Sequence, residues 1–108
     1  MKKQVLDQNT LDDIIKRVVE VAQPQRIILF GSAVRGAMTR NSDIDLLIVK
    51  DGGDARNLMA QIYRKLHGVG VAVDAVVVSS EDVERFRDSH ALIIKPALKE
   101  GRIVYEAS

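Results

Sequence analysis

The segment GSAVRGAMTRNSDIDLLIV, residues 31–49, decides how this chain is interpreted. Its first two residues, Gly31 and Ser32, directly follow RIILF, residues 26–30, which has the length and the β-branched composition of a strand. A glycine at such a point lets the backbone approach a phosphate, and backbone N–H groups at the start of a following helix point at an anion. A glycine-serine pair is also a common way to end a strand in a plain turn, so this pair alone leaves both interpretations open.

Two acidic residues open the strand-like run at the end of the same segment, residues 43–49. Asp43 and Asp45 are two positions apart, so a strand places both carboxylates on one side, within reach of one cation. After Asp45 both faces of the run are apolar, which predicts a strand covered on both sides whose start alone reaches a cleft. A turn after residues 41–42 would explain Asp43 without any function, but it would not explain Asp45 inside the apolar run.

A third acid, Asp74, interrupts the valine-rich run VGVAVDAVVV, residues 69–78. A carboxylate among apolar residues costs free energy unless it is paired or bound to a metal. The residues alone leave three interpretations open. Asp74 is a metal ligand, or a charge on an edge strand that faces water and prevents edge pairing, or half of a buried ion pair with Arg35 or Arg40.

The rest of the chain alternates helical and extended patterns. Thr10 is expected to cap the first helix and Pro24 to end it, Ser79 or Ser80 to cap a later helix, and Pro96 to kink or restart the last one. The order favours an α/β or α+β layer of helices on a small sheet, with the strand order left open. The predicted strands are 26–30, 43–49, 69–78 and 102–105, and the predicted helices are 10–22, 33–38, 54–66, a helix after residue 80, and 89–100.

Composition excludes several kinds of site. The 108 residues are expected to form one domain, residues 1–108, and the net charge of +1 is less basic than a protein that binds nucleic-acid phosphates directly would carry. The absence of cysteine excludes disulfides, thiolate zinc sites and cysteine nucleophiles, and two histidines argue against a histidine-rich metal site. The chain shows neither a signal peptide nor a membrane-length apolar run, so we expect a cytoplasmic protein with no membrane partner.

The three features together form a specific pattern. Gly31-Ser32, ten residues, Asp43, one residue and Asp45 would match a chain of this length by chance roughly once in a thousand. The segment resembles the G-S-x(10)-D-x-D signature of the polymerase-β-like nucleotidyltransferase superfamily. The third acid in VAVDAVVV and the ending LKEGRIVYE are similar to its smallest branch, the minimal nucleotidyltransferases. The resemblance covers about residues 26–106 and implies an α+β fold, a small mixed β-sheet flanked by helices.

The resemblance also implies catalytic roles for the three acids. Asp43 and Asp45 would bind two Mg²⁺ ions together with the triphosphate of ATP. Asp74 would be the third metal-binding carboxylate and would help to deprotonate the acceptor hydroxyl. Two metal ions stabilise the attacking and leaving oxygens of an in-line displacement, and three neighbouring acids are tolerable only with cations between them.

The nucleotide-binding residues implied by the same resemblance are Gly31 and Ser32, which would hold the β- and γ-phosphates. Arg35 and Arg40 are candidates for additional phosphate contacts, although a mobile surface arginine is the better explanation of each. The chain has no tryptophan to stack on a base, and we interpret its two tyrosines as core or interface residues rather than chemical groups.

Finally, the resemblance implies a partner. Proteins of this branch are often encoded beside an all-helical HEPN protein, a ribonuclease-like toxin, and act as its antitoxin, in some cases by adding AMP to a toxin tyrosine. We therefore expect Mg²⁺-dependent transfer of AMP from ATP to a tyrosine hydroxyl of a HEPN toxin. The alternatives are a non-catalytic antitoxin that occludes the toxin, and a catalytic subunit that modifies a small molecule such as an aminoglycoside. A homo-oligomer is compatible with each.

Overall fold

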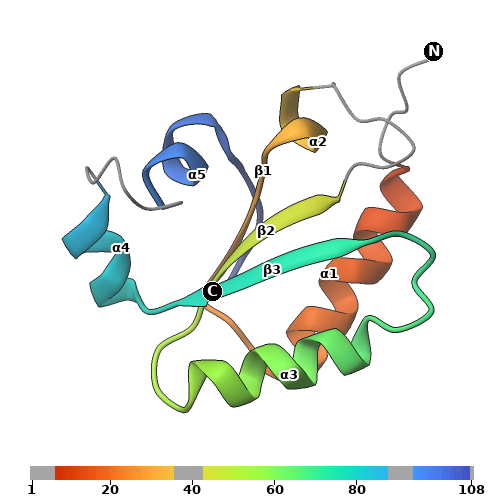
Figure 1. Cartoon of the computed structure of the whole chain (residues 1–108), viewed down its shortest axis with the longest axis horizontal. Helices are drawn as coiled ribbons and strands as arrows, with labels where there is room; N and C mark the ends of the chain where they lie inside the picture. The colour runs from red at the N-terminus through yellow and green to blue at the C-terminus, as the bar shows by residue number, and fades with distance from the viewer. Residues whose placement is uncertain (1–6, 36–42, 88–93, 108) are drawn as a thin grey trace.

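The computed structural model describes residues 7–35, 43–87 and 94–107. These residues form five helices and four strands (Figure 1). In chain order they are α1 (Gln8–Ala22), β1 (Arg26–Phe30), α2 (Ser32–Arg35), β2 (Ile44–Val49), α3 (Ala55–Lys65), β3 (Val73–Val78), α4 (Ser80–Phe86), α5 (Ile94–Glu100) and β4 (Arg102–Glu106). Among them, no helix has the length and apolar character that crossing a bilayer requires.

The four strands form one mixed sheet in the order β3-β2-β1-β4. β1 is antiparallel to both β2 and β4, whereas β2 and β3 are parallel and joined through α3. The parallel pair requires a crossover connection, which the helical segment between the two strands supplies. The expected α+β class is therefore confirmed, and β4 lies at one edge of the sheet.

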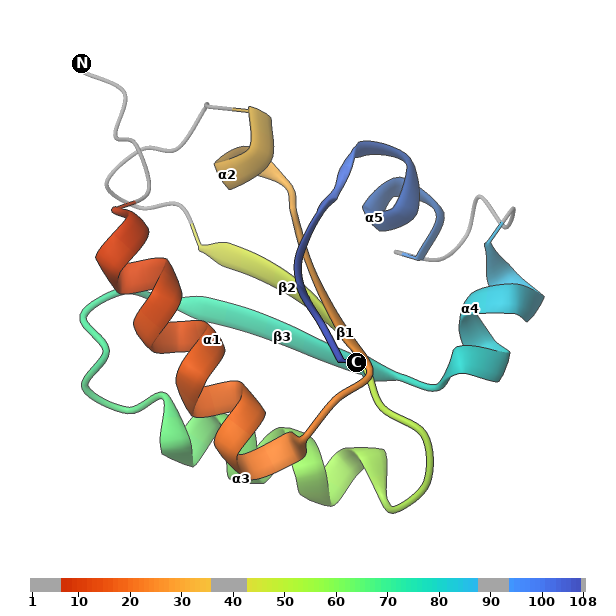
Figure 2. The same ribbon diagram turned by 180° about the vertical axis from the view of Figure 1, so that it is seen from behind.

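Helices cover both faces of the sheet. α1 and α3 pack on one face, against inward side chains of β1 and β2, while α5 and the end of α4 pack on the other (Figures 1 and 2). β2 lies inside this sandwich, and all of its residues except Asp45 are buried. This confirms the prediction of a strand covered on both sides whose start alone is accessible.

The N-cap of the first helix lies three residues earlier than the sequence pattern predicts. Asp7, not Thr10, is the N-cap of α1, and its carboxylate accepts a hydrogen bond of 3.0 Å from the N–H of Asn9. Thr10 lies inside the first turn, so the prediction that it caps the helix is wrong. At the other end Gln23 adopts a left-handed conformation, φ +46°, and Pro24 follows, as predicted. A residue before proline avoids the helical region, which explains the stop.

The third strand is shorter than predicted. The valine-rich run suggested a strand over 69–78, but β3 covers only Val73–Val78. Gly68 and Gly70 have φ values of +85° and +95°, which are incompatible with an extended strand and hold the chain in a turn. The alternation of apolar residues therefore extends beyond the strand into a turn, and the two glycines determine the conformation of that turn.

Two of the remaining helices, α3 and α4, begin with N-caps of the usual residue types. Asp54 caps α3, and Ser79 caps α4 in a capping box with Asp82, since each side chain binds the other residue's backbone N–H. Pro96 lies in the first turn of α5, where a missing N–H leaves no helical hydrogen bond unmade. Of the helices predicted at 33–38 and 89–100, residues 36–38 and 89–93 lie outside the described part of the chain.

Candidate functional site

The three sequence features meet at one end of the sheet. β1 is antiparallel to β2, so the carboxyl end of β1, where Gly31 follows, adjoins the start of β2. β3 runs parallel to β2, so it starts at the same end. The register is specific, because Asp45 lies opposite Phe30 on one side and opposite Asp74 on the other. The sheet therefore brings together residues that are about 40 positions apart in the sequence.

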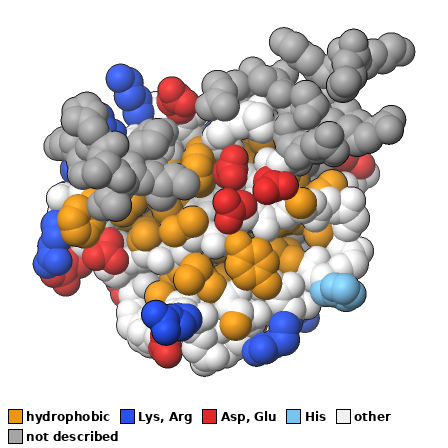
Figure 3. Space-filling view, in the orientation of Figure 1, with side chains coloured by type: hydrophobic (Ala, Val, Ile, Leu, Met, Phe, Trp, Pro, Cys, Tyr) orange, Lys and Arg blue, Asp and Glu red, His pale blue; other side chains and the backbone are white. Residues whose placement is uncertain are grey.

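Asp45 and Asp74 also point to the same side of the sheet. Partners in a parallel ladder share a face, and here it is the face that α4 and α5 cover farther along the strands. Asp45 is half-buried, and Asp74 is exposed on the edge strand. Asp43, just before β2, is exposed as well. Acidic side chains gather on the face that β3 presents (Figure 3).

Two like charges directly opposite each other on neighbouring strands are destabilising. Asp74 is exposed, which argues against the predicted alternative of a buried ion pair, and the side chains of Arg35 and Arg40 lie outside the described part of the structure. Its exposed place on an edge strand matches the second alternative, a charge that prevents edge pairing. That alternative does not explain why the register partner of Asp74 is a second acid, Asp45. A cation bound between the two carboxylates would explain this pairing.

Gly31 stands against the carboxylate of Asp45. Its φ is +77°, a conformation that side-chain-bearing residues rarely adopt. A Cβ at this position would overlap Oδ2 of Asp45 and stand 3.2 Å from its Cγ. The carbonyl oxygen of Gly31 accepts a hydrogen bond of 3.1 Å from the N–H of Val34 as α2 begins. Gly31 is thus more than a turn residue, because its missing side chain leaves the space that the Asp45 carboxylate occupies.

Tyr63 is a residue of this site that the sequence did not reveal. Its hydroxyl oxygen accepts a hydrogen bond of 3.0 Å from the N–H of Ala75, and it lies 3.3 Å from Oδ1 of Asp74 and 3.4 Å from the carbonyl oxygen of Ala75. Only the order of the elements could have indicated this contact, because a helix that connects two parallel strands packs beside the strand that follows it. Tyr63 is 44% exposed, so it is not a core residue, and the prediction of an interface role stays a prediction.

Mg²⁺ fits the donor set that these acids provide. In the described parts of the chain, no three Asp, Glu, His or Cys side chains are arranged to hold a metal ion by themselves. Mg²⁺ is usually bound by one or two carboxylates, with substrate phosphates and water as the other ligands. Neighbouring Asp45 and Asp74 supply carboxylates of this kind, and a bound triphosphate would supply the remaining oxygens.

The structure says little about the two arginines predicted to contact phosphate. Arg35 is the last residue of α2, close in sequence to Gly31 and Ser32. Arg40, the other candidate for a phosphate contact, lies outside the described residues.

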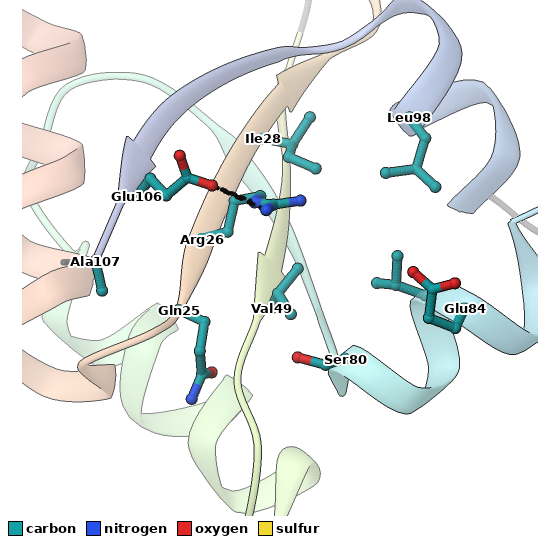
Figure 4. Close-up of a pocket in the computed structure, with 10 residues that line it drawn as sticks. Gln25, Arg26, Ile28, Val49, Ser80, Glu84, Leu98, Glu106 and Ala107 are labelled. Carbon is teal, nitrogen blue, oxygen red and sulfur yellow. Dashed lines mark hydrogen bonds and ion pairs between the residues drawn. The ribbon is translucent and has the colours of Figure 1, made fainter.

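A separate groove lies at the opposite end of β1. It has a volume of about 400 Å³ and contains the ion pair between Arg26 and Glu106, whose closest atoms are 2.8 Å apart (Figure 4). Arg26 lies four positions along the strand from Phe30, roughly 13 Å away, and Phe30 adjoins the acidic site. The lining combines a paired arginine with Glu84, Val83 and Leu98, and it includes none of the residues predicted to bind a nucleotide.

Comparisons with known proteins identify the family of the chain. A family model described as "Polymerase beta, Nucleotidyltransferase" matches residues 10–108. A Methanocaldococcus jannaschii protein named "Putative protein adenylyltransferase" is 37% identical over 81 residues, which cover 75% of this chain and 78% of the relative.

Solved structures share the fold. A toxin-antitoxin complex with AMP-PNP contains a chain that matches with a TM-score of 0.66 at 20% identity, over 95% of this chain and 76% of that one. A complex of a tri-AMPylated Shewanella oneidensis HEPN toxin with an MNT antitoxin matches with a TM-score of 0.64 at 17% identity, over 94% and 74%. The extent of the family match and the identity to the archaeal relative carry the assignment: this chain belongs to the polymerase β nucleotidyltransferase family.

Proposed function

We propose that this protein transfers AMP from ATP to a hydroxyl group of a protein partner, at the end of the sheet where Asp43, Asp45 and Asp74 lie. The observation that carries the proposal is the register of β2 and β3, which sets the carboxylates of Asp45 and Asp74 side by side on one face. Membership of a nucleotidyltransferase family supports the reaction class.

The nucleotide would bind with its β- and γ-phosphates against Gly31 and Ser32, with Arg35 and Arg40 as further phosphate contacts. The close approach of the Gly31 backbone to Asp45 supports this placement, because phosphate and carboxylate oxygens would then share the same cations. Two Mg²⁺ ions, held by Asp43, Asp45 and Asp74, would supply charge neutralisation for the triphosphate and for the attacking and leaving oxygens.

In the transfer step the acceptor oxygen forms a bond to the α-phosphorus of ATP. The bond from the α-phosphorus to the bridging oxygen of the β-phosphate breaks, and pyrophosphate leaves. Asp74 takes the proton of the acceptor hydroxyl, a role that its exposure at the sheet edge supports, since an acceptor from a second molecule can reach it. The products are an AMP ester of the acceptor and pyrophosphate.

We propose a tyrosine of a HEPN toxin as the acceptor, with the chain acting as its antitoxin. Two observations on relatives support this choice. The archaeal relative carries the name of a protein adenylyltransferase, and a structural neighbour is an MNT antitoxin in complex with a tri-AMPylated HEPN toxin.

The test incubates this protein with a purified HEPN toxin as partner, ATP and Mg²⁺. ATP labelled at the α-phosphate should label the partner, and ATP labelled at the γ-phosphate should not, because pyrophosphate leaves. The Asp43→Asn, Asp45→Asn double variant is the control and should give no labelled partner. Labelling from the γ-phosphate would replace nucleotidyl transfer by phosphoryl transfer. An unlabelled partner that both the parent and the double variant neutralise equally would show occlusion instead.

A further inference from the structure

The hydroxyl group of Tyr63 is held in place by the backbone of the edge strand. Its oxygen accepts the N–H of Ala75 at 3.0 Å, so its own hydrogen is free to be donated. The two acceptors within reach are Oδ1 of Asp74, at 3.3 Å, and the carbonyl oxygen of Ala75, at 3.4 Å. Tyr63 therefore links the fixed backbone of β3 to the side chain of the neighbouring acid.

Asp74 has little else to orient it. It is exposed, and its hydrogen bond with Tyr63 is the only polar contact of its carboxylate with another described residue. An exposed aspartate without a partner samples several rotamers, and fixing it on binding a cation costs conformational free energy. The Tyr63 hydroxyl reduces that cost, since it is already anchored to Ala75 before a cation arrives.

We infer that Tyr63 is a positioning residue that presets the carboxylate of Asp74 for Mg²⁺, an inference that rests on the proposed function of Asp74. The hydroxyl donates to one carboxylate oxygen and leaves the other available to the metal. Donors of this kind behind a metal ligand are worth about 10- to 100-fold in metal affinity. The bond of 3.3 Å is long for a hydroxyl donor, so we expect the lower end of that range.

The chain offers a matched control. Tyr105, the second tyrosine, lies on β4 at the other edge of the sheet, and its hydroxyl forms no hydrogen bond with any described residue. Tyr63→Phe and Tyr105→Phe therefore remove the same atom, but only the first removes a contact to Asp74. Both rings remain, so packing is conserved in each variant.

The test measures the binding of a fluorescent AMP-PNP analogue at 25 °C while Mg²⁺ is raised. Tyr63→Phe should raise the Mg²⁺ concentration at half-maximal binding about tenfold, and Tyr105→Phe should leave it at the parent value. Circular dichroism checks that each variant is folded. In an Asp74→Asn background the same Tyr63→Phe change should have no further effect, because its influence passes through that carboxylate.

The possible failures can be told apart. Equal Mg²⁺ midpoints for Tyr63→Phe and Tyr105→Phe, beside a raised midpoint for Asp74→Asn, would overturn the positioning role and leave the metal site intact. A parent-like midpoint for Asp74→Asn would remove Asp74 from the metal site, and the role of Tyr63 with it. AMP attached to Tyr63 after incubation with ATP would also overturn the inference, because the hydroxyl would then be an acceptor.

Discussion

Gly31 and Gly53 have the same backbone conformation, φ +77°, in very different surroundings. A Cβ on Gly31 would collide with the Asp45 carboxylate, whereas a Cβ on Gly53 would meet nothing within 4 Å. The pair separates two effects of replacing a glycine: the strain of a left-handed backbone, which both positions share, and the loss of space at the candidate site, which affects Gly31 alone.

Gly31→Ala should therefore destabilise the protein more than Gly53→Ala does and should abolish binding of Mg²⁺ and AMP-PNP. Gly53→Ala should cost about 1–2 kcal/mol from backbone strain and should leave nucleotide binding unchanged. Denaturant unfolding gives the stabilities, and isothermal titration gives the binding. Parent-like nucleotide affinity in Gly31→Ala would mean that Gly31 only terminates β1.

The substitution Asp74→Asn tests whether Asp74 forms a stabilising ion pair. Its contact with the described residues is a hydroxyl group, and its register partner is another carboxylate, so the substitution removes a repulsion and strands no cation among the described side chains. Without Mg²⁺ the variant should be at least as stable as the parent, while transfer activity falls by orders of magnitude. A loss of about 3–5 kcal/mol in a melting curve would instead reveal an ion pair broken by the change.

At the scale of elements, Asp51 joins the loop after β2 to the start of α4. Its two carboxylate oxygens accept hydrogen bonds from the backbone N–H and the hydroxyl of Ser80, at 2.7 and 2.9 Å. These two bonds, the backbone one foremost, lower the pKa of Asp51 below its ordinary value. The bonds link segments 29 residues apart, and they complement the capping box of Ser79 and Asp82 at the same helix end.

The lowered pKa predicts a pH-dependent contribution to stability. Asp51 binds its proton less tightly in the folded state, so its contribution is complete above the unfolded pKa, about 3.9. It disappears as the pH falls through the lower folded-state pKa. The melting temperature of Asp51→Asn should therefore lie below that of the parent at pH 7 and approach it in strong acid.

Ser80→Ala keeps the backbone donor and removes the hydroxyl, so its effect at pH 7 should be smaller than that of Asp51→Asn. A difference between parent and Asp51→Asn that is the same at pH 7 and in strong acid would show that the charge of Asp51 is not involved.

Sequence patterns predicted the inner elements better than their ends. β1 and β2 were correctly placed because burial on both faces leaves an almost continuous apolar run. The start of β3 was wrong because Val69 and Val71 continue the apolar alternation into a turn fixed by two glycines. The cap of α1 was wrong because Asp7 and Thr10 are both residue types that cap helices well, and the helix extends through residues 8–10 to the earlier of the two.

At the scale of the molecule, the sequence could predict those parts of the candidate site whose residues lie close together in the chain. Gly31, Asp43 and Asp45 lie within 15 residues, so one segment contains their pattern. The pairing of Asp45 with Asp74 depends on strand order, which the sequence left open, and the contact of Tyr63 depends on how α3 packs beside β3. Such long-range relations arise from the whole sheet and leave no short motif.

The whole molecule also presents two rival places for a nucleotide. One is the acidic end of the sheet, and the other is the groove with the Arg26–Glu106 pair at the far end of β1. The groove already has its arginine neutralised and contains a second glutamate, Glu84, so it offers little to a triphosphate.

A crystal structure of the protein with AMP-PNP and Mn²⁺ tests the central claim most directly, since anomalous scattering locates the metal. Our account predicts Mn²⁺ beside Asp45 and Asp74, with the β- and γ-phosphates against Gly31 and Ser32. Nucleotide in the groove beside Arg26, with no metal at Asp45, would contradict it.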